Sequence, residues 1–203
     1  MRTITKGSKG EEVKTLQSVL HLAQDGIFGS ITEEALNDFK KSHNLPEDGI
    51  CDTRTWIALL PDRLLTAHKR TINEIIVHCT ATPEGRDYTV EQIRKQHKAQ
   101  GWNDIGYHYV VYRDGSIHEG RSVEVTGAHC NGHNLHSIGV VYVGGCDKAM
   151  RPKDTRTDAQ KESLYFLLKV LKRHYPKATI HGHNEYAAKA CPSFNVKEEY
   201  IDL

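Results

Sequence analysis

The feature that most constrains the fold is an alternation of short apolar runs with helix-like segments over the last two-thirds of the chain. Four runs are rich in β-branched or aromatic residues, at 75–77, 107–113, 138–143 and 179–180. Such runs favour strands. Apolar residues at helical spacing mark helices between them, at 89–100 and 157–174. This alternation predicts an α/β domain in which helices cover a mixed central sheet.

Local signals support two of these predicted elements. Thr89 and Gln92 have the spacing of a capping box, which predicts that a helix begins there. Asp114-Gly115 directly follows the predicted strand at 107–113, and this dipeptide favours a tight hairpin. We therefore expect an antiparallel strand immediately after it.

The first sixty residues have a different pattern, without predicted strands. Val13, Leu16 and Leu20 have helical spacing. A second helix is expected to begin at Ser30, with Glu33 completing a capping box, and a third to cover about 53–60. The sequence thus predicts a small all-α three-helix domain before the α/β domain.

A weak repeat lies inside this helical region. Asp25-Gly26-Ile27 recurs as Asp48-Gly49-Ile50. Each copy is interpreted as an Asp-Gly turn, one buried isoleucine and a capped helix. Asp-Gly turns are common, so the repeat predicts a duplicated structural element and no particular function.

The boundary between the two patterns is polar and irregular. Pro61 suits the end of a helix, and residues 62–72 show no apolar periodicity. We therefore predict a helical domain at 1–62, a linker at 63–72 and an α/β domain at 73–203.

Composition excludes several classes of protein. The 203 residues carry a net charge of +1, which gives no support for nucleic-acid binding. Five dispersed cysteines do not form the pattern of a secreted disulfide framework, so a reducing compartment is expected during folding. The chain begins without the apolar stretch of a signal peptide, and no run is long enough to span a membrane.

The candidate chemistry lies near the ends of two predicted strands. His181 and His183 lie two residues apart on a strand, and Cys191 can return to the same point if the intervening loop curls. Imidazole and thiolate ligands suit zinc, and three protein ligands would leave a fourth position open for water. His78 ends the strand at 75–77, where a lone histidine is more often hydrogen-bonded than functional. From the residues alone, zinc binding and an ordinary structural role both stay open.

Longer motifs resolve this choice through a family resemblance. The stretches are Val77–Thr82, Gln100–Tyr109, Arg113–Gly115, Ser137–Val140, His183–Glu185 and Lys189–Phe194. In this order they resemble the zinc-dependent N-acetylmuramoyl-L-alanine amidases of the phage-lysozyme type, which are related to peptidoglycan-recognition proteins. The resemblance covers roughly residues 73–194.

The resemblance implies a set of site residues. The metal ligands of the family fall on His78, His183 and Cys191, with one Zn²⁺ per chain. Its catalytic tyrosine falls on Tyr107 and its catalytic lysine on Lys189. His129 lies in a segment similar to the substrate groove of the family and is a candidate substrate contact, whereas His181 has no equivalent role. Recognition proteins that only bind lack the metal-binding cysteine, so Cys191 implies activity.

The first part of the chain resembles a second family. The segments at 9–17, 25–29 and 35–41 are similar to the three-helix peptidoglycan-binding domain found beside many cell-wall hydrolases. Together the two resemblances imply a monomeric hydrolase that binds bacterial peptidoglycan and cleaves the amide between N-acetylmuramic acid and L-alanine. We expect a phage or prophage endolysin, made in the cytoplasm and delivered to the wall by another factor.

Two other functions remain open from the sequence. One is a zinc carboxypeptidase or endopeptidase acting on the stem peptide, because His181-Gly182-His183 resembles the His-x-His element of such enzymes. The other is a non-catalytic peptidoglycan-recognition module.

Overall fold

The computed structural model describes residues 3–59 and 70–203, and the chain forms two compact units, Met1–Thr66 and Ala67–Leu203. The predicted linker at 63–72 falls mostly outside the described residues, as do residues 60–62 of the predicted helical domain. Those predicted boundaries therefore stay predictions.

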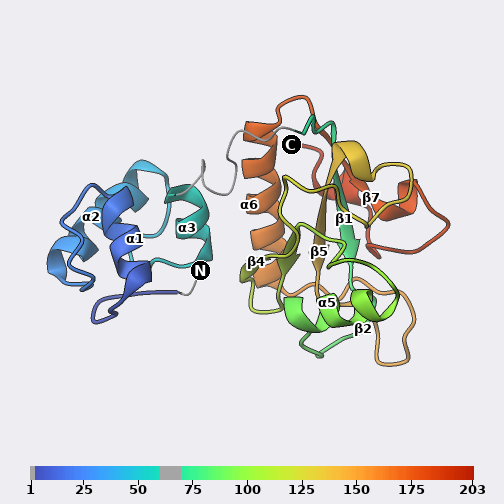
Figure 1. The fold of residues 1–203 in the computed structure, drawn as a ribbon, viewed down its shortest axis with the longest axis horizontal. Helices are drawn as coiled ribbons and strands as arrows, with labels where there is room; N and C mark the ends of the chain where they lie inside the picture. Colours follow the sequence, from blue (N-terminus) through green and yellow to red (C-terminus); the bar gives the residue numbers. More distant parts are fainter. Residues whose placement is uncertain (1–2, 60–69) are drawn as a thin grey trace. The chain divides into compact units, whose positions relative to one another are not determined.

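The first unit is built from three helices, labelled in Figure 1. These are α1 (Glu11–Val19), α2 (Ser30–Ser42) and α3 (Thr53–Leu59). Their apolar faces meet in one core, which consists of Ile4, Val13, Leu16, Phe28, Leu36, Cys51, Trp56 and Leu59. The helical spacing of the sequence thus predicts this unit correctly.

The repeat has a physical basis in two buried polar side chains. Gln17 on α1 donates to the Ile27 carbonyl oxygen at 3.1 Å and to Asp25 Oδ1 at 2.6 Å. Lys40 on α2 donates to the Ile50 carbonyl oxygen at 2.7 Å and pairs with Asp48. In both copies a buried side chain on the preceding helix therefore fixes the Asp-Gly turn that follows it.

The predicted burial of the isoleucine in each turn is wrong. Ile27 is 47% exposed and Ile50 is 37% exposed, whereas the next residues, Phe28 and Cys51, are buried. In each copy the isoleucine amide donates to the aspartate side chain and its carbonyl accepts from the buried Gln17 or Lys40. The backbone of the isoleucine thus belongs to the turn, and the following side chain enters the core.

The second helix begins at Ser30 as predicted, but its predicted cap is wrong. Ser30 is the first residue of α2, and Gly29 is the N-cap without any side-chain cap. Glu33 does not reach back to the helix start, because its carboxylate lies 2.8 Å from Lys6 Nζ in an ion pair. A tertiary contact therefore replaces the expected capping box.

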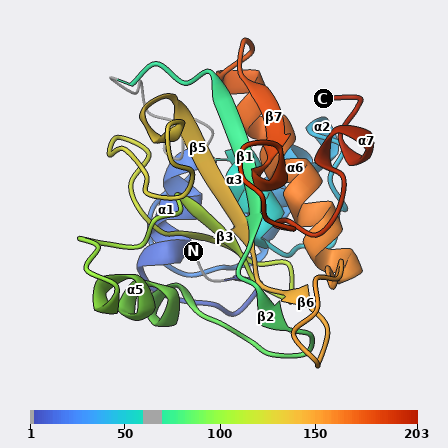
Figure 2. The same cartoon turned by 90° about the vertical axis from the view of Figure 1, so that its right-hand side faces the viewer.

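The second unit contains the predicted mixed sheet, with the strand order β4-β3-β5-β1-β7. The strands are β1 (Glu74–Cys79), β3 (Tyr109–Val111), β4 (Ile117–Glu119), β5 (Ser137–Tyr142) and β7 (Thr179–Gly182). Strand β1 pairs in parallel with β5 and β7, as Figure 2 shows. Strand β4 returns antiparallel beside β3, which confirms the hairpin predicted at Asp114-Gly115. A separate two-stranded sheet pairs β2 (Thr82–Pro83) with β6 (Gly145–Cys146).

Helices cover the sheet and fix its strands. Helix α5 (Val90–Ala99) has the predicted Thr89–Gln92 capping box and packs Val90 and Ile93 against strand residues. Helix α6 (Asp158–His174) buries four leucines and runs along the sheet in Figure 1. Short helices η1 (Asn134–His136), η2 (His183–Glu185) and α7 (Val196–Glu199) complete the unit. The α/β fold class predicted from the sequence is confirmed.

Two properties of the whole chain bear on its chemistry. All five cysteines are free thiols. Across residues 3–59 and 70–203, no helix combines the length and the apolar character needed to cross a bilayer.

Candidate metal centre

Three side chains from separate segments converge in the second unit. His78, His183 and Cys191 each direct one donor atom to a common point, and these atoms all lie within 4.8 Å of one another. Cys191 Sγ lies 3.8 Å from His78 Nδ1, and the two imidazole centroids are 4.6 Å apart. It is the one such cluster of histidine, cysteine and acidic side chains in the described part of the chain.

The parallel sheet explains why the two histidines meet. His78 is the second-to-last residue of β1, and His183 directly follows β7. Because β1 and β7 are parallel neighbours, their carboxyl ends lie at the same edge of the sheet. His78 is fully buried there, so the packing of the sheet fixes its ring.

Cys191 reaches the same edge on a loop that the sheet holds in place. The Cys79 amide donates to Cys191 Sγ at 3.2 Å, and Tyr142 Oη donates to the Pro192 carbonyl oxygen at 2.6 Å. Both partners belong to the central strands β1 and β5. The loop between His183 and Cys191 therefore curls back as the sequence requires for a shared site.

The residues after Cys191 anchor this loop a second time. Ser193 Oγ donates to the Gly145 carbonyl oxygen at 2.9 Å. The Arg156 guanidinium lies 3.4 Å from the centroid of the Phe194 ring and pairs with Asp154 at 2.8 Å. Charge and stacking at this buried arginine thus limit the movement of the cysteine ligand.

The protonation states suit a cation. Burial, followed by the nearby His129 and His183, keeps the pKa of His78 well below its usual value, so this imidazole is neutral at pH 7. Burial and Lys189 lower the pKa of His183 in the same way. The contact with the Cys79 thiol and burial raise the pKa of Cys191, so its thiol needs a cation to lose the proton.

The donor set fits zinc. Imidazole nitrogen and thiolate sulfur are both zinc ligands, and three protein ligands leave a fourth tetrahedral position open. Zinc–ligand bonds of about 2.0 and 2.3 Å would place a nitrogen and a sulfur donor about 3.5 Å apart. The observed separation of 3.8 Å between His78 Nδ1 and Cys191 Sγ is close to this value.

His181, the other histidine of the His-x-His element, takes no part in the cluster. Its Nδ1 lies 2.8 Å from Glu185 Oε2, and its Nε2 lies 2.8 Å from Thr179 Oγ1. Both ring nitrogens are therefore engaged away from His78 and Cys191. The two-histidine pattern expected for a stem-peptidase site is not formed.

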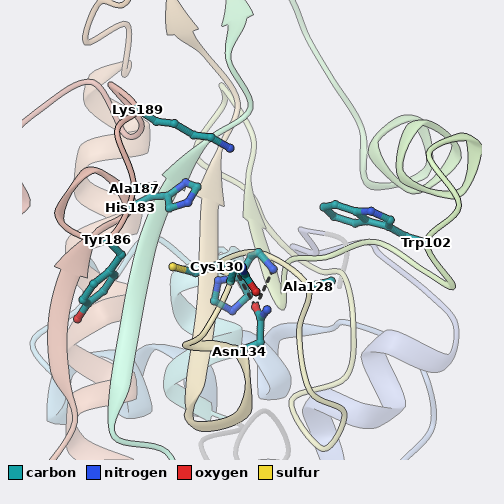
Figure 3. A pocket seen from close by; sticks show the side chains of 10 residues that line it. Trp102, Ala128, Cys130, Asn134, His183, Tyr186, Ala187 and Lys189 are labelled. Atoms are coloured by element: carbon teal, nitrogen blue, oxygen red, sulfur yellow. Dashed lines mark hydrogen bonds between the residues drawn. The ribbon is translucent and has the colours of Figure 1, made fainter.

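A pocket of about 330 Å³ opens beside the cluster. Its lining residues are Trp102, Ala128, His129, Cys130, Asn131, Asn134, His183, Tyr186, Ala187 and Lys189. Figure 3 shows Trp102 on one side and His183 with Lys189 on the other. Trp102 is 39% exposed and its ring packs on His97 at 4.5 Å, so a flat apolar surface faces the pocket.

Two of the other predicted site residues, Lys189 and His129, line this pocket, whereas Tyr107 is not among its lining residues and lies beside His78. The Tyr107 ring lies 5.1 Å from the His78 ring, and burial, followed by the neighbouring cysteines, raises the pKa of its hydroxyl. Tyr107 therefore keeps its proton at neutral pH and can act as a donor.

Sequence reasoning did not identify several pocket residues. Trp102 lies inside one of the recognised motifs, but nothing in its spacing indicates a place in a pocket wall. Asn131 and Tyr186 lie in turn and loop segments, whose positions depend on tertiary contacts. For Tyr186 such a contact is visible, since its hydroxyl donates to Glu74 at 2.7 Å.

Comparison with protein families gives two matches. The N-acetylmuramoyl-L-alanine amidase family model matches residues 68–194, and the model of a peptidoglycan binding domain matches residues 9–59. The endolysin of Klebsiella phage KP32 is 44% identical over 125 residues, which cover 62% of this chain and 83% of that protein. The endolysin of Escherichia phage T7 is 42% identical over 135 residues, which cover 66% and 89%.

Solved structures of amidases and endolysins are also similar to this chain. The endolysin N-acetylmuramoyl-L-alanine amidase LysCS from Clostridium intestinale aligns with a TM-score of 0.57 at 27% identity, over 66% of this chain and 84% of that chain. The endolysin of the Thermus scotoductus bacteriophage Ph2119 aligns with a TM-score of 0.55 at 26% identity, over 69% and 96%.

Proposed function

Because the chain belongs to the N-acetylmuramoyl-L-alanine amidase family, we propose that it cleaves peptidoglycan with a zinc ion held by His78, His183 and Cys191. The scissile bond is the amide between N-acetylmuramic acid and L-alanine. The observation that carries the zinc proposal is the convergence of three donor atoms within 4.8 Å beside a pocket. When bound, zinc supplies Lewis-acid activation of water at neutral pH for attack on an amide carbonyl.

Lys189 contributes positive charge on the same side of the pocket as His183. Attack on an amide carbonyl develops negative charge on its oxygen, and a fixed cation nearby stabilises that charge. We assign Lys189 this role, which requires the carbonyl oxygen to lie on the lysine side of the pocket.

Tyr107 contributes a proton donor close to the metal ligands. Its ring lies 5.1 Å from that of His78, and its raised pKa keeps the hydroxyl protonated. Cleavage of the amide requires a proton for the departing amine of L-alanine. We assign Tyr107 the role of delivering this proton or of orienting the attacking water.

The residues on the two sides of the pocket suit a substrate that extends in two directions from the scissile bond. Trp102 offers a flat ring opposite Lys189, which suits the apolar face of a sugar. The sugar and the stem peptide would then occupy opposite ends of the pocket. The predicted substrate contact at His129 stays a prediction within this scheme.

The first unit is proposed to hold the enzyme on its polymeric substrate. Residues 9–59 match a peptidoglycan binding domain, and the proposed boundaries remain 1–62 for this domain, 63–72 for the linker and 73–203 for the amidase. We propose a monomer that acts as a phage or prophage endolysin on the cell wall after release by another factor, as the endolysin relatives suggest.

Product chemistry tests the proposed reaction. Purified walls digested with the zinc-loaded protein should gain free L-alanine amino termini without new reducing sugar ends. Cys191→Ser should abolish the gain, whereas Cys146→Ser, which changes a cysteine outside the cluster, should preserve it. New reducing ends would instead identify a glycosidase, and amino termini other than L-alanine would identify a stem peptidase.

A further inference from the structure

His78 has a second ring nitrogen, which points away from the ligand cluster into the interior. While Nδ1 faces Cys191 Sγ, His78 Nε2 lies 3.1 Å from His129 Nδ1. The other nitrogen of His129, Nε2, lies 3.3 Å from Ser137 Oγ. All three side chains are buried, so a chain of hydrogen bonds shielded from solvent runs from His78 through His129 to Ser137.

The position of His129 is fixed by two glycines. A Cβ atom at Gly139 would lie 2.5 Å from His129 Cδ2, and one at Gly127 would lie 2.6 Å from the same atom. Any side chain at either position would therefore displace the ring. The backbone amide of His129 also donates to Asn134 Oδ1 at 2.8 Å, which holds its Cα. The surroundings leave this imidazole one position, in hydrogen-bond reach of His78.

The proton on His78 decides whether this residue can bind a metal. A neutral imidazole carries one proton, so Nδ1 has a free lone pair only when the proton is on Nε2. A proton on His78 Nε2 requires an acceptor, and His129 Nδ1 is at the right distance. His129 then carries its own proton on Nε2 and donates it to Ser137 Oγ.

We propose that His129 is a positioning residue that holds His78 in the tautomer whose Nδ1 can bind the metal. The inference rests on the proposed zinc site and deepens it. Groups that hydrogen-bond to a metal-bound histidine fix its tautomer and orientation, and their loss weakens metal binding about tenfold to a hundredfold. His129 is 8% exposed and both its ring nitrogens face protein atoms, so its loss acts first on metal affinity.

Two substitutions at position 129 separate the hydrogen bond from the packing. His129→Leu keeps a bulky side chain but removes the acceptor, and we expect zinc binding to weaken about tenfold to a hundredfold. His129→Asn places Oδ1 where Nδ1 lies now, so the asparagine can still accept from His78 Nε2. We expect the zinc affinity of this variant to be reduced by less than about tenfold relative to wild type. Rescue by asparagine but not by leucine is the signature of an acceptor.

Ser137→Ala tests the same line of hydrogen bonds from its far end. Removing Oγ leaves the fixed position of His129 unchanged, and we expect a smaller loss, below about tenfold. His118→Asn is the matched control, because His118 on β4 hydrogen-bonds to Ser116 and has no part in the cluster. It should bind zinc as wild type does.

The measurement is the zinc dissociation constant by chelator competition, with ¹⁵N chemical shifts of the histidine rings in the zinc-loaded protein. We expect His78 of wild type to be protonated at Nε2 and to bind zinc through Nδ1. The zinc affinity should fall from wild type to His129→Asn and again to His129→Leu. Equal affinities for the leucine and asparagine variants would overturn the role of His129 while leaving the zinc site intact. A His78 protonated at Nδ1 would overturn the role of His129 and would also remove His78 from the proposed ligand set. If wild type binds no zinc at all, the proposed function itself fails. If His129→Leu does not fold, the role of His129 is still tested by the tautomer of His78, measured in the zinc-loaded His129→Asn and Ser137→Ala variants.

Discussion

The two units of the chain bury polar side chains for different purposes. In the first unit, Lys40 and Gln17 are hydrogen-bonded to the turns that follow their helices. In the second unit, donor atoms of His78, His183 and Cys191 face one another across less than 4.8 Å, and one imidazole approaches the thiol only at 3.8 Å. Buried polar atoms that close on their own partners stabilise a fold, whereas buried donor atoms that converge on a common point indicate a site for a ligand.

The comparison predicts that the largest effects on rate come from single polar atoms beside the cluster. Tyr107→Phe removes only a hydroxyl, yet turnover of a soluble muropeptide should fall about a hundredfold to ten-thousandfold, as for the loss of a general acid or base. Zinc content should not change, because Tyr107 is outside the ligand set. Tyr88→Phe, on a tyrosine that donates to Gln96, serves as the control. Unchanged turnover in the Tyr107 variant would remove this residue from the mechanism.

Removing the charge at position 189 is expected to have the next largest effect. Lys189→Met keeps a side chain of similar length but cannot stabilise developing negative charge, so kcat should fall about a hundredfold or more. The binding of zinc should persist. Lys148→Met changes an exposed lysine outside the pocket and should leave kcat as it is. A loss of equal size in both variants would argue against a specific role for Lys189.

A substitution in the core of the first unit should lower the stability of that unit without changing the rate of amide cleavage. Lys40→Met leaves the Ile50 carbonyl without its buried donor, which should lower the free energy of unfolding of this unit by about 1–3 kcal/mol. Cleavage of soluble muropeptides should stay at the wild-type rate, while release of material from intact walls should decline. Lys41→Met, at the exposed neighbouring position, is the matched control for thermal unfolding. A large loss of muropeptide turnover in the Lys40 variant would contradict the separation of roles.

The zinc affinity of the second unit should depend on pH. The Cys79 contact and burial raise the pKa of the Cys191 thiol, so zinc must displace a proton from it near neutral pH. The pKa values of His78 and His183 are lowered, so these rings are already neutral and release none. One released proton makes zinc affinity rise about tenfold for each pH unit between pH 6 and 8. Chelator competition across this range measures the slope, and a flat profile would mean that Cys191 is already a thiolate.

Much of the architecture can be predicted from local patterns. The strand that carries His78, the Thr89–Gln92 cap and the hairpin after Val111 follow from residues close together in the sequence. The capping box predicted for α2 is absent, because Glu33 pairs with Lys6 across the unit. Local patterns predict where a helix lies, whereas the contacts of its terminal side chains depend on residues that are distant in the sequence.

The site, too, can be predicted only in part from the local sequence. Spacing alone indicates that His183 and Cys191 can meet, but the curl of the loop depends on the Tyr142 hydrogen bond and on the stacking of Arg156 on Phe194. The place of Trp102 in the pocket wall depends in the same way on its packing against His97. These contacts join residues far apart in the chain, so they become visible only in the folded structure.

X-ray absorption at the zinc edge identifies the atoms bound to the metal. For the zinc-loaded full chain, we expect nitrogen or oxygen ligands at about 2.0 Å together with one sulfur at about 2.3 Å. The sulfur contribution should disappear in Cys191→Ser and remain in Cys146→Ser. A wild-type spectrum without sulfur, or a sulfur contribution that survives loss of Cys191, would contradict a metal centre formed by His78, His183 and Cys191.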